Sequence, residues 1–542
     1  MDSQERIASP SVSRRAQAGV ILRRVSSYPV LLGALLVLAT FVVTLEFRVD
    51  PDTWLHDVVG QRILSTHSWP RIDTYSFTAP GTEWMAYEWL ADVALAQALR
   101  FGGLRGWMGL LFGLASCLIL LTYYYAYLRC RNAKAAFAAT ALVLPLAGVW
   151  FTLHPQLFGY VLLVITLICL EHFHQGRRSV LWLLPMVFLL WVNTHGTFVL
   201  GFCALGIYWL GGWVDFRTGS LLADRWPASA RIQMAAVVLA SLLACCVTPY
   251  GTRLLTYPGQ VFFLQPQMTA SMESWQPIPF NIWHGQLFLA FVLLFFAAVA
   301  AYQPRLPIAD LALLFLAVIM TAFHTRALPL FVIVFAPLLA GLLDRWIPNY
   351  EPRKDLHSLN TLFIVLAALG IVMGFPSRQK VEGKIAESLP QGAVDYLRAH
   401  PQPRPMLNDL AWGGYLLYSL GPEQRVFMDC RIDIYEYTGV LSDYLKMMKL
   451  DPDTPRLLEE YQLRSCLIPS RAALATFLQG SPAWKKVYSD KMCALFVRRC
   501  SGGLNAARWQ GKLAATTFSA VNSPPQYQVA SQPRKHAYAD MD

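Results

Sequence analysis

YPVLLGALLVLATFVVTLEF (28–47) is an almost unbroken apolar run, and RVDPDTWLHDVVGQRIL (48–64) follows it directly. A run of about 20 apolar residues is long enough to cross a bilayer as a helix. Four arginines between residues 14 and 24 precede the run, and it lacks a small-residue cleavage site. We therefore expect a first transmembrane helix that is retained rather than removed as a signal peptide. Acidic residues and a histidine then stand at the point where this helix leaves the membrane.

The composition is that of an integral membrane protein. Of the 542 residues, 55% are hydrophobic and 15% are charged, whereas about a quarter of the residues in an ordinary soluble domain are charged. The net charge of +11 would suit nucleic acid, but the basic residues form small clusters between apolar runs rather than a basic stripe. Such clusters are typical of cytoplasmic loops. We therefore expect membrane lipids, and no nucleic acid, as partners.

About eleven apolar stretches are long enough to be transmembrane helices. They cover residues 28–46, 106–126, 135–153, 157–173, 179–194, 197–216, 232–249, 284–303, 306–323, 327–346 and 359–376. Basic clusters fall on alternate loops, which assigns those loops and the amino terminus to the cytoplasm. The sequence thus predicts a cytoplasmic segment (1–27) and a transmembrane domain (28–376) whose long loop 47–105 lies on the outer side.

The composition changes after the last apolar stretch. PMLND, RVFMDC, SCLIP and ALFVRR are typical of short strands, and they alternate with the helix-like segments WGGYLLYSL, GVLSDYLKMMK and TPRLLEEY. This alternation predicts a soluble α/β domain over residues 377–500, on the outer side because the number of spans is odd. The tail 501–542 has no apolar periodicity, which predicts disorder. The expected fold is mostly α, a polytopic helical bundle with an outer α/β domain.

Unusual polar residues gather in the loops and turns on the predicted outer side. Because polar groups at membrane depth are costly and tend to face a cavity or one another, their collection at one end predicts a single outward-facing site. These residues are Asp50, Asp52, His56, Glu88, His154, Gln156, Asn193, His195, Glu273, Gln276, His324 and Arg326.

Two interpretations of DPDTWLH (50–56) stay open. In the first, Asp50 is an N-cap, Pro51 is the first helical residue and Asp52 complements the helix dipole, so the carboxylates only begin a helix. In the second, they also carry chemistry, because capping does not explain His56, which lies one turn after Asp52 on the same helix face.

The other polar residues also have a structural and a functional interpretation. Glu88 would complement a helix dipole, and Asn193 and His195 would form a tight turn between two helices. Arg326, next to His324, would either reach the lipid headgroups or bind a phosphate or carboxylate through its planar fork.

These motifs resemble those of the GT-C superfamily of membrane glycosyltransferases. Its members share a multi-span helical body, an acidic motif just after the first helix, amphipathic helices in the first outer loop, and often a soluble outer domain at the carboxyl end. Here Asp50-Pro51-Asp52 would be the acidic motif and EWLADVALAQAL the surface helix.

A group of uncharacterised bacterial multi-pass proteins near that superfamily is more similar. The shared motifs are DPDTWLHDVVGQRIL, YEWLADV, HPQLFGY, WVNTHGTFVLG, TPYGTRLL, SWQPIPF and WGGYLLYSL…VFMDCRIDIY, over roughly residues 28–498. In that group the last motif usually reads DGRxDxY, and here Cys430 replaces the glycine.

The resemblance implies sugar transfer, with inversion, from a polyprenyl-phosphate carrier to a cell-envelope acceptor on the outer side of the bacterial plasma membrane. It implies catalytic roles for Asp50, Asp52 and His56, with one aspartate as general base, and phosphate binding by His324 and Arg326. Asp50 and Asp52 would also be oxygen ligands suited to Mg²⁺ or Mn²⁺, as in some GT-C relatives. The side chains expected to line the site are those of Glu88, His154, Asn193, His195 and Glu273.

Two other functions stay open. In a transporter or lipid-handling protein the polar cluster would be a binding site near the bilayer midplane. Transporters usually carry charges within their spans and show paired halves, whereas here the charges lie at the outer ends and no internal repeat is visible. In a non-catalytic scaffold or sensor built on the α/β domain, the acidic motif would only cap a helix.

Overall fold

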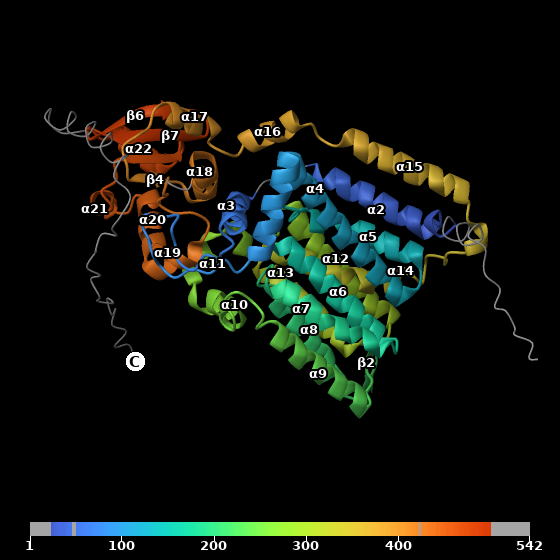
Figure 1. The fold of residues 1–542 in the computed structure, drawn as a ribbon. Coiled ribbons are helices and arrows are strands. Elements are labelled where there is room, and N and C mark those ends of the chain that lie inside the picture. Colours follow the sequence, from blue (N-terminus) through green and yellow to red (C-terminus); the bar gives the residue numbers. More distant parts are fainter. Residues whose placement is uncertain (1–22, 46–49, 422–423, 500–542) are drawn as a thin grey trace, which may run out of the picture.

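The computed structural model describes residues 23–45, 50–421 and 424–499. Most of the molecule is a bundle of apolar helices, and an α/β domain lies at one end of it (Figure 1). The predicted tail 501–542 and most of the predicted cytoplasmic segment 1–27 lie outside the described residues.

Within the described residues, five helices are long and apolar enough to cross a membrane. They are Trp89–Cys130 (α4), Gln156–His174 (α6), Trp283–Tyr302 (α12), Thr325–Leu343 (η3 and α14) and His357–Gly374 (α15). The shorter apolar helices are Tyr28–Thr44 (α2), Ala133–Gly148 (α5), Arg178–Val192 (η1 and α7), Phe198–Gly211 (α8), Ala228–Ala244 (α9) and Ile308–Phe323 (α13). Each apolar stretch found in the sequence overlaps one of these helices. The predicted fold class, a polytopic helical bundle with a small α/β domain, is confirmed.

The helix α14 lies at the centre of the bundle. Nearly all of its side chains are buried, and it packs against α4, α5 and α13. By contrast, α12 and α15 expose most of their apolar side chains. A helix that is apolar all round is stable in this way when its outer surface faces lipid.

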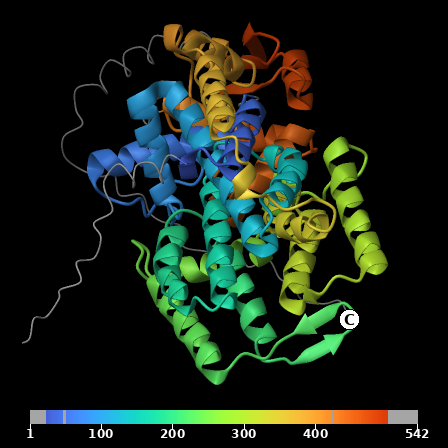
Figure 2. The same cartoon turned by 90° about the vertical axis from the view of Figure 1, so that its right-hand side faces the viewer.

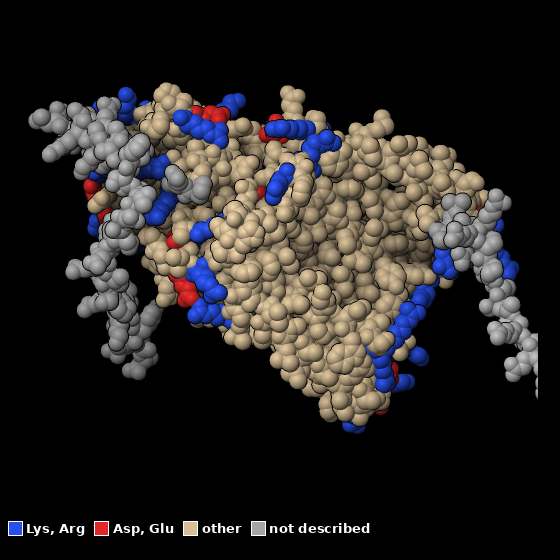
Figure 3. Space-filling view, viewed as in Figure 1, with Lys and Arg blue, Asp and Glu red and all other residues tan. Residues whose placement is uncertain are grey.

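The end of the bundle opposite the α/β domain carries a small sheet. The strands Phe216–Thr218 (β1) and Leu221–Ala223 (β2) form an antiparallel hairpin, and Leu306–Pro307 (β3) pairs with β2 in parallel. Figure 2 views the molecule from this end, with the hairpin at its edge. In Figure 3, lysines and arginines gather at the two ends, and the wide zone between them has few charged side chains. This zone has the character of a surface that faces the bilayer.

The first long loop folds against the α/β end of the bundle. It contains the helix Pro51–Thr66 (α3), which packs on α4 and on the helix Gly413–Leu420 (α18). The predicted surface helix EWLADVALAQAL is the first arm of α4, and the predicted span from residue 106 is its second arm. Between them Gly103 has φ 58° and ψ −151°, a conformation that is open mainly to glycine and that kinks the helix.

The α/β domain is built on a four-stranded sheet. Its strands are Met406–Asn408 (β4), Ser465–Pro469 (β5), Trp484–Ser489 (β6) and Cys493–Arg498 (β7), in the order β4-β5-β7-β6. The pair β4 and β5 is parallel, and β7 is antiparallel to both of its neighbours. Its helices are Gln391–Ala399 (α17), α18, Ile432–Thr438 (α19), Val440–Lys449 (α20), Thr454–Glu460 (α21) and Ala473–Gly480 (α22), and Arg378–Ala386 (α16) leads in from α15.

The prediction of a strand at RVFMDC (425–430) is wrong. Instead of joining the sheet, Val426 pairs with the first long loop: its N–H donates to Tyr75 O at 3.0 Å, and Phe77 N–H donates to Val426 O at 3.1 Å. Its apolar side chains are buried because they lie between the domain and that loop. The edge strand β6 was missed because its two consecutive lysines, which are exposed, interrupt the apolar pattern that predicts a strand. Exposed lysines are usual in an edge strand.

Candidate active site

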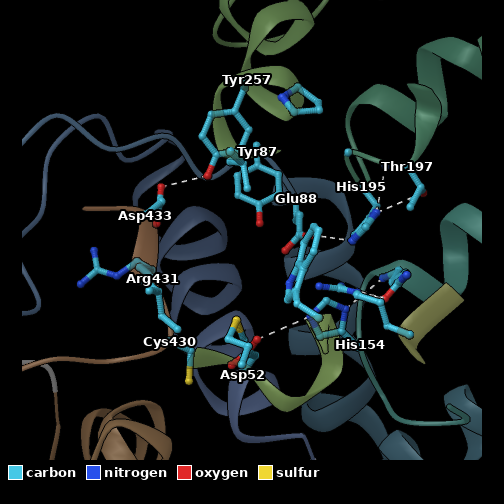
Figure 4. Close-up of a pocket in the computed structure, with 18 of the residues that line it drawn as sticks. Asp52, Tyr87, Glu88, His154, His195, Thr197, Tyr257, Cys430, Arg431 and Asp433 are labelled. Atoms are coloured by element: carbon cyan, nitrogen blue, oxygen red, sulfur yellow. Dashed lines mark hydrogen bonds and ion pairs between the residues drawn. The ribbon is translucent and has the colours of Figure 1, made fainter. Parts of the chain in front are cut away.

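A cavity of about 450 Å³ lies where the helical bundle meets the α/β domain. Its wall is formed by α3, the start of α4, the turns before α6 and α8, the helix Arg253–Leu264 (α10), the turn between α13 and α14, and residues 430–433 (Figure 4). The titratable side chains that line the cavity include Asp52, His56, Glu88, Asp92, His154, His195, His324, Arg326, Cys430, Arg431 and Asp433. Only the folded chain brings these segments together.

Asp50 and Asp52, at the start of α3, have different surroundings. Asp50 is the N-cap, and its carboxylate accepts a hydrogen bond from Asp52 N–H at 3.2 Å. The side chain of Asp50 is not among those that line the cavity, whereas those of Asp52 and His56 are. The capping interpretation therefore describes Asp50, and the shared helix face brings Asp52 and His56 to the cavity.

His56 is held by two carboxylates. Its Nδ1 lies 2.7 Å from Asp92 Oδ1, and its Nε2 lies 3.6 Å from Glu88 Oε2. Burial lowers the pKa of His56, but the charge and hydrogen bond of Asp92, together with the charges of Glu88 and Asp52, outweigh burial and raise the pKa to about 9. His56 therefore carries a positive charge at neutral pH.

Glu88 lies between His56 and His195. Its Oε1 is 3.2 Å from His195 Nε2. Nδ1 of His195 accepts from Thr197 N–H at 3.0 Å, so the neutral ring carries its proton on Nε2, the nitrogen nearer to Glu88. Burial raises the pKa of Glu88 to about 7, against the lowering effect of His56 and His154. Glu88 therefore changes charge near neutral pH.

Asp52 faces a third imidazole. His154 Nε2 lies 3.5 Å from Asp52 Oδ2, and Nδ1 of His154 accepts from Gln156 N–H at 3.2 Å. Burial raises the pKa of Asp52, but the hydrogen bond and charge of His154, the Cys430 thiol and the charge of His56 bring it below its usual value. Asp52 is therefore an ionised carboxylate.

The three imidazoles form a row. The ring of His154 lies between those of His56 and His195, with centroids 5.6 and 5.9 Å away. Each ring faces a carboxylate: His56 faces Asp92, His154 faces Asp52 and His195 faces Glu88.

Arg326 and His324 lie in the turn between α13 and α14. Nε and Nη2 of Arg326 donate to Gln156 Oε1 at 3.0 and 2.8 Å, and the guanidinium lies 4.8 Å from the ring centroid of Trp275. His324 donates from Nδ1 to Trp275 O at 2.9 Å. These contacts fix the plane of the guanidinium at the cavity wall.

The α/β domain is anchored beside the cavity by Arg431. Its Nη2 donates to Asp429 Oδ2 at 2.6 Å and lies 2.7 Å from Asp73 Oδ1 in the first long loop. The guanidinium also lies against the rings of Tyr75 and Trp84, 5.0 and 4.7 Å from their centroids. A buried guanidinium with two carboxylates and two aromatic faces holds the loop and the domain in one arrangement.

Next to this anchor, Asp433 points toward the cavity (Figure 4). Tyr257 of α10 donates its hydroxyl to Asp433 Oδ2 at 2.9 Å, and the Tyr257 ring packs on Tyr87, with centroids 4.6 Å apart. The motif VFMDCRIDIY thus supplies both the anchor and a polar group of the site.

Most of the residues expected at the site lie at this cavity. Asn193 does not line it: the side chain accepts from Trp89 Nε1 at 2.7 Å and donates to Leu189 O and Val247 O, so it joins helices. The side chain of Glu273 lies outside the described part of the chain. Asp92 was missed, because in EWLADVALAQAL it is simply a polar residue in the first turn of a helix.

The predicted metal site is not formed by the residues that the structure describes. No group of three or more histidine, cysteine, aspartate or glutamate side chains there is placed to hold a metal ion. Asp50 caps α3, and Asp52 faces His154 and Cys430. Metal binding by Asp50 and Asp52 therefore stays a prediction, and no step of the reaction below is assigned to a metal.

Comparison with known proteins returns solved structures only. No family model and no curated protein matches the chain. Two structures of the oligosaccharyltransferase AglB from Archaeoglobus fulgidus match with TM-score 0.45 and 11% identity, over 80% of this chain and 69% of theirs. One is in complex with an inhibitory peptide and a dolichol-phosphate, and the other is tethered to an acceptor peptide containing the NVT sequon.

ArnT from Cupriavidus metallidurans, bound to undecaprenyl phosphate, matches with TM-score 0.47 and 15% identity, over 90% of this chain and 100% of that one. At these scores and identities the chemistry has to be argued from the residues of this chain.

Proposed function

We propose that the chain is a membrane glycosyltransferase that moves a sugar from a polyprenyl-phosphate carrier to a cell-envelope acceptor. One observation carries the proposal: a single cavity joins carboxylate–imidazole pairs, a fixed guanidinium and a wall of apolar side chains. Carboxylates and imidazoles can move the acceptor proton, and a guanidinium can bind a phosphate. The apolar wall can take the first isoprene units of the carrier.

Arg326 is the residue that we expect to bind the donor phosphate. Two of its N–H groups are used by Gln156, and the remaining guanidinium donors would form charge-assisted hydrogen bonds with phosphate oxygens. Met320 and Leu330, on the two helices that flank Arg326, and Val199 and Leu200 of α8 belong to the same wall. The phosphate of a lipid carrier would therefore bind Arg326 while its hydrocarbon chain contacts the neighbouring apolar side chains.

Glu88 is the group that we expect to accept the proton of the acceptor. Its pKa of about 7 suits a base that works near neutral pH, because such a base is ionised and still proton-seeking. The pKa of Asp52 is lowered instead, so Asp52 is the weaker base. We assign Asp52 and His154 to hydrogen bonds with the sugar hydroxyls.

In the proposed step, an acceptor hydroxyl or amide attacks the anomeric carbon from the face opposite the phosphate. The bond from acceptor to anomeric carbon forms while the bond from that carbon to the phosphate oxygen breaks, which inverts the configuration. Glu88 takes the proton that the acceptor loses. The electron pair of the broken bond stays on the polyprenyl phosphate, whose charge Arg326 and the His56 cation stabilise.

We assign the site to the outer side of the bacterial plasma membrane, with the amino terminus in the cytoplasm. The basic clusters of the loops support this orientation. A reporter that is active only outside the cytoplasm should be active when inserted near Gly81 and when fused after residue 500. Inactivity at either position would contradict the orientation.

The activity itself is tested in proteoliposomes that contain the purified protein, a polyprenyl-phosphate sugar labelled in the sugar, and a cell-envelope extract as acceptor. We expect label to move from the lipid to the extract. If a panel of such donors gives no transfer while the protein stays folded, the transporter, lipid-handling or scaffold function becomes the better interpretation.

A further inference from the structure

We propose that Asp92 is a positioning residue that fixes His56 as an imidazolium, so that the cavity offers a donor phosphate a second cation besides Arg326. This inference rests on the proposed function only for the identity of the phosphate. The pairing itself is a property of α3 and α4, and it can be measured without any reaction.

The two helices meet closely at this point. Gly60 lies one turn after His56 on the same face of α3, and a Cβ at Gly60 would overlap the backbone carbonyl of Asp92 and lie 2.9 Å from Ala96 Cβ. The missing side chain therefore lets α3 lie directly against the turn of α4 that carries Asp92. This contact holds His56 Nδ1 at 2.7 Å from the Asp92 carboxylate.

The geometry at the ring nitrogens favours the charged form. Nδ1 of His56 faces Asp92, and Nε2 faces Glu88 at 3.6 Å. A neutral imidazole has a single N–H and cannot donate toward two carboxylates, whereas an imidazolium can. Asp92 is 2% exposed, so water screens its charge little and the pairing with His56 is strong.

Four titratable groups face His56 from the surrounding elements. Asp92 lies in the first turn of α4, and Glu88 is the residue directly before that helix. Asp52 lies one turn before His56 in α3, and His154 lies in the turn before α6. Three of them are carboxylates. Because Asp92 is bonded to Nδ1, the Nε2–H of His56 stays directed to the cavity.

Asp92 and Glu88 therefore have different roles. Asp92 is occupied by His56 and supplies charge and orientation, while Glu88, with the longer contact, remains able to accept a proton. Asp92 touches neither sugar nor phosphate in this arrangement and acts through His56.

The test is a titration of His56 in full-length protein that carries ¹⁵N-labelled histidine in lipid nanodiscs, with His56→Gln to assign the signal. In the wild type we expect both ring nitrogens of His56 to stay protonated at pH 7.5. Asp92→Asn keeps an acceptor for Nδ1–H but removes the charge, so the titration midpoint should fall by about 1–3 pH units. Asp57→Asn is the matched control, because Asp57 is a buried carboxylate of α3 that does not line the cavity, and it should leave the midpoint unchanged.

A second readout uses polyprenyl phosphate without sugar. Asp92→Asn should weaken its binding about tenfold at pH 8, or about 1.4 kcal/mol. The loss should be much smaller at pH 6, where His56 regains its proton. A uniform loss at both pH values would show that Asp92 only maintains the fold, and would overturn the inference.

The outcomes separate this inference from the proposed function. A wild-type His56 that is neutral at pH 7.5 overturns the inference even if Asp92→Asn fails to fold. An Asp92→Asn midpoint equal to that of Asp57→Asn overturns it as well. If the midpoint shifts as expected and no sugar is transferred, the role of Asp92 stands and the glycosyltransferase proposal fails.

Discussion

Replacing Glu88 by glutamine tests the assignment of the base. Glutamine has nearly the same size as glutamate and can keep an oxygen at the position of Glu88 Oε1, which lies 3.2 Å from His195 Nε2. It cannot accept the acceptor proton. Because a positioned base contributes about 10²- to 10⁴-fold in rate, we expect the transfer rate to fall by that factor, or about 2.7–5.4 kcal/mol of transition-state stabilisation.

The pH profile of the wild type sharpens this test. Below pH 7 Glu88 is protonated, since its pKa is raised to about 7, so the rate should fall as the pH decreases through 7. Above pH 9 His56 loses its charge, since its pKa is about 9, so the rate should fall again. Initial rates in proteoliposomes from pH 5.5 to 10 should give a bell with limbs near 7 and 9, and the low-pH limb should vanish in Glu88→Gln.

Asp57→Asn is the control for this measurement. Burial also raises the pKa of Asp57 to about 7, but its side chain bonds to Gln61 at 2.6 Å and does not line the cavity. The control should keep both the rate and the pH profile. The assignment of Glu88 is refuted if Glu88→Gln transfers sugar within about threefold of the wild type, or if Asp57→Asn removes the low-pH limb instead.

Three further predictions concern the cavity wall. Asp52→Asn removes the charge from its hydrogen bonds to the sugar and should lower the transfer rate about 10- to 100-fold, whereas Asp50→Asn should keep the rate, because asparagine caps a helix as well as aspartate does; equal rates in the two variants would contradict the separation of their roles. Arg326→Lys keeps the charge and loses the planar fork, so the KM for the lipid donor should rise about 10- to 100-fold while thermal stability changes little. An unchanged KM would remove Arg326 from the phosphate site. Gly60→Ala forces α3 away from α4 and should cost about 1–3 kcal/mol of stability, seen as a lower unfolding temperature in detergent; a variant as stable as the wild type would refute the close contact.

The helices of the bundle could be predicted from the sequence because the signal for a span is local. A stretch of about 20 apolar residues has few other stable structures, and the stretches at 28–46 and 359–376 overlap α2 and α15. The kink at Gly103 was not predicted, although the arms on either side of it were, because a glycine inside a helical pattern is compatible with both a straight and a bent helix.

The site could be predicted only in part. The acidic motif correctly identified the start of α3 as part of the site. It did not show that Asp50 caps the helix while Asp52, two residues later, lines the cavity. That difference depends on where the helix begins. Asp92 could not be found from local pattern, because its partner His56 lies 36 residues earlier and meets it through tertiary packing alone.

The wrong strand at residues 425–430 has a similar cause. An apolar run bounded by polar residues indicates a buried extended segment, but the sequence does not say what buries it. Here the first long loop does so, through Tyr75 and Phe77, and the same contact brings Cys430 and Asp433 to the cavity.

The central claim, sugar transfer from a polyprenyl-phosphate carrier at this cavity, is tested most directly by mass spectrometry of lipid-linked sugars and envelope glycans in a deletion strain. The strain is complemented with the wild type, with Glu88→Gln or with Asp57→Asn, at equal protein levels. We predict that one polyprenyl-phosphate sugar accumulates, and the matching sugar disappears from an envelope glycan, in the deletion strain and with Glu88→Gln, and that the wild type and Asp57→Asn restore both. Unchanged lipid-linked sugars and glycans in the deletion strain, or full restoration by Glu88→Gln, would contradict the claim.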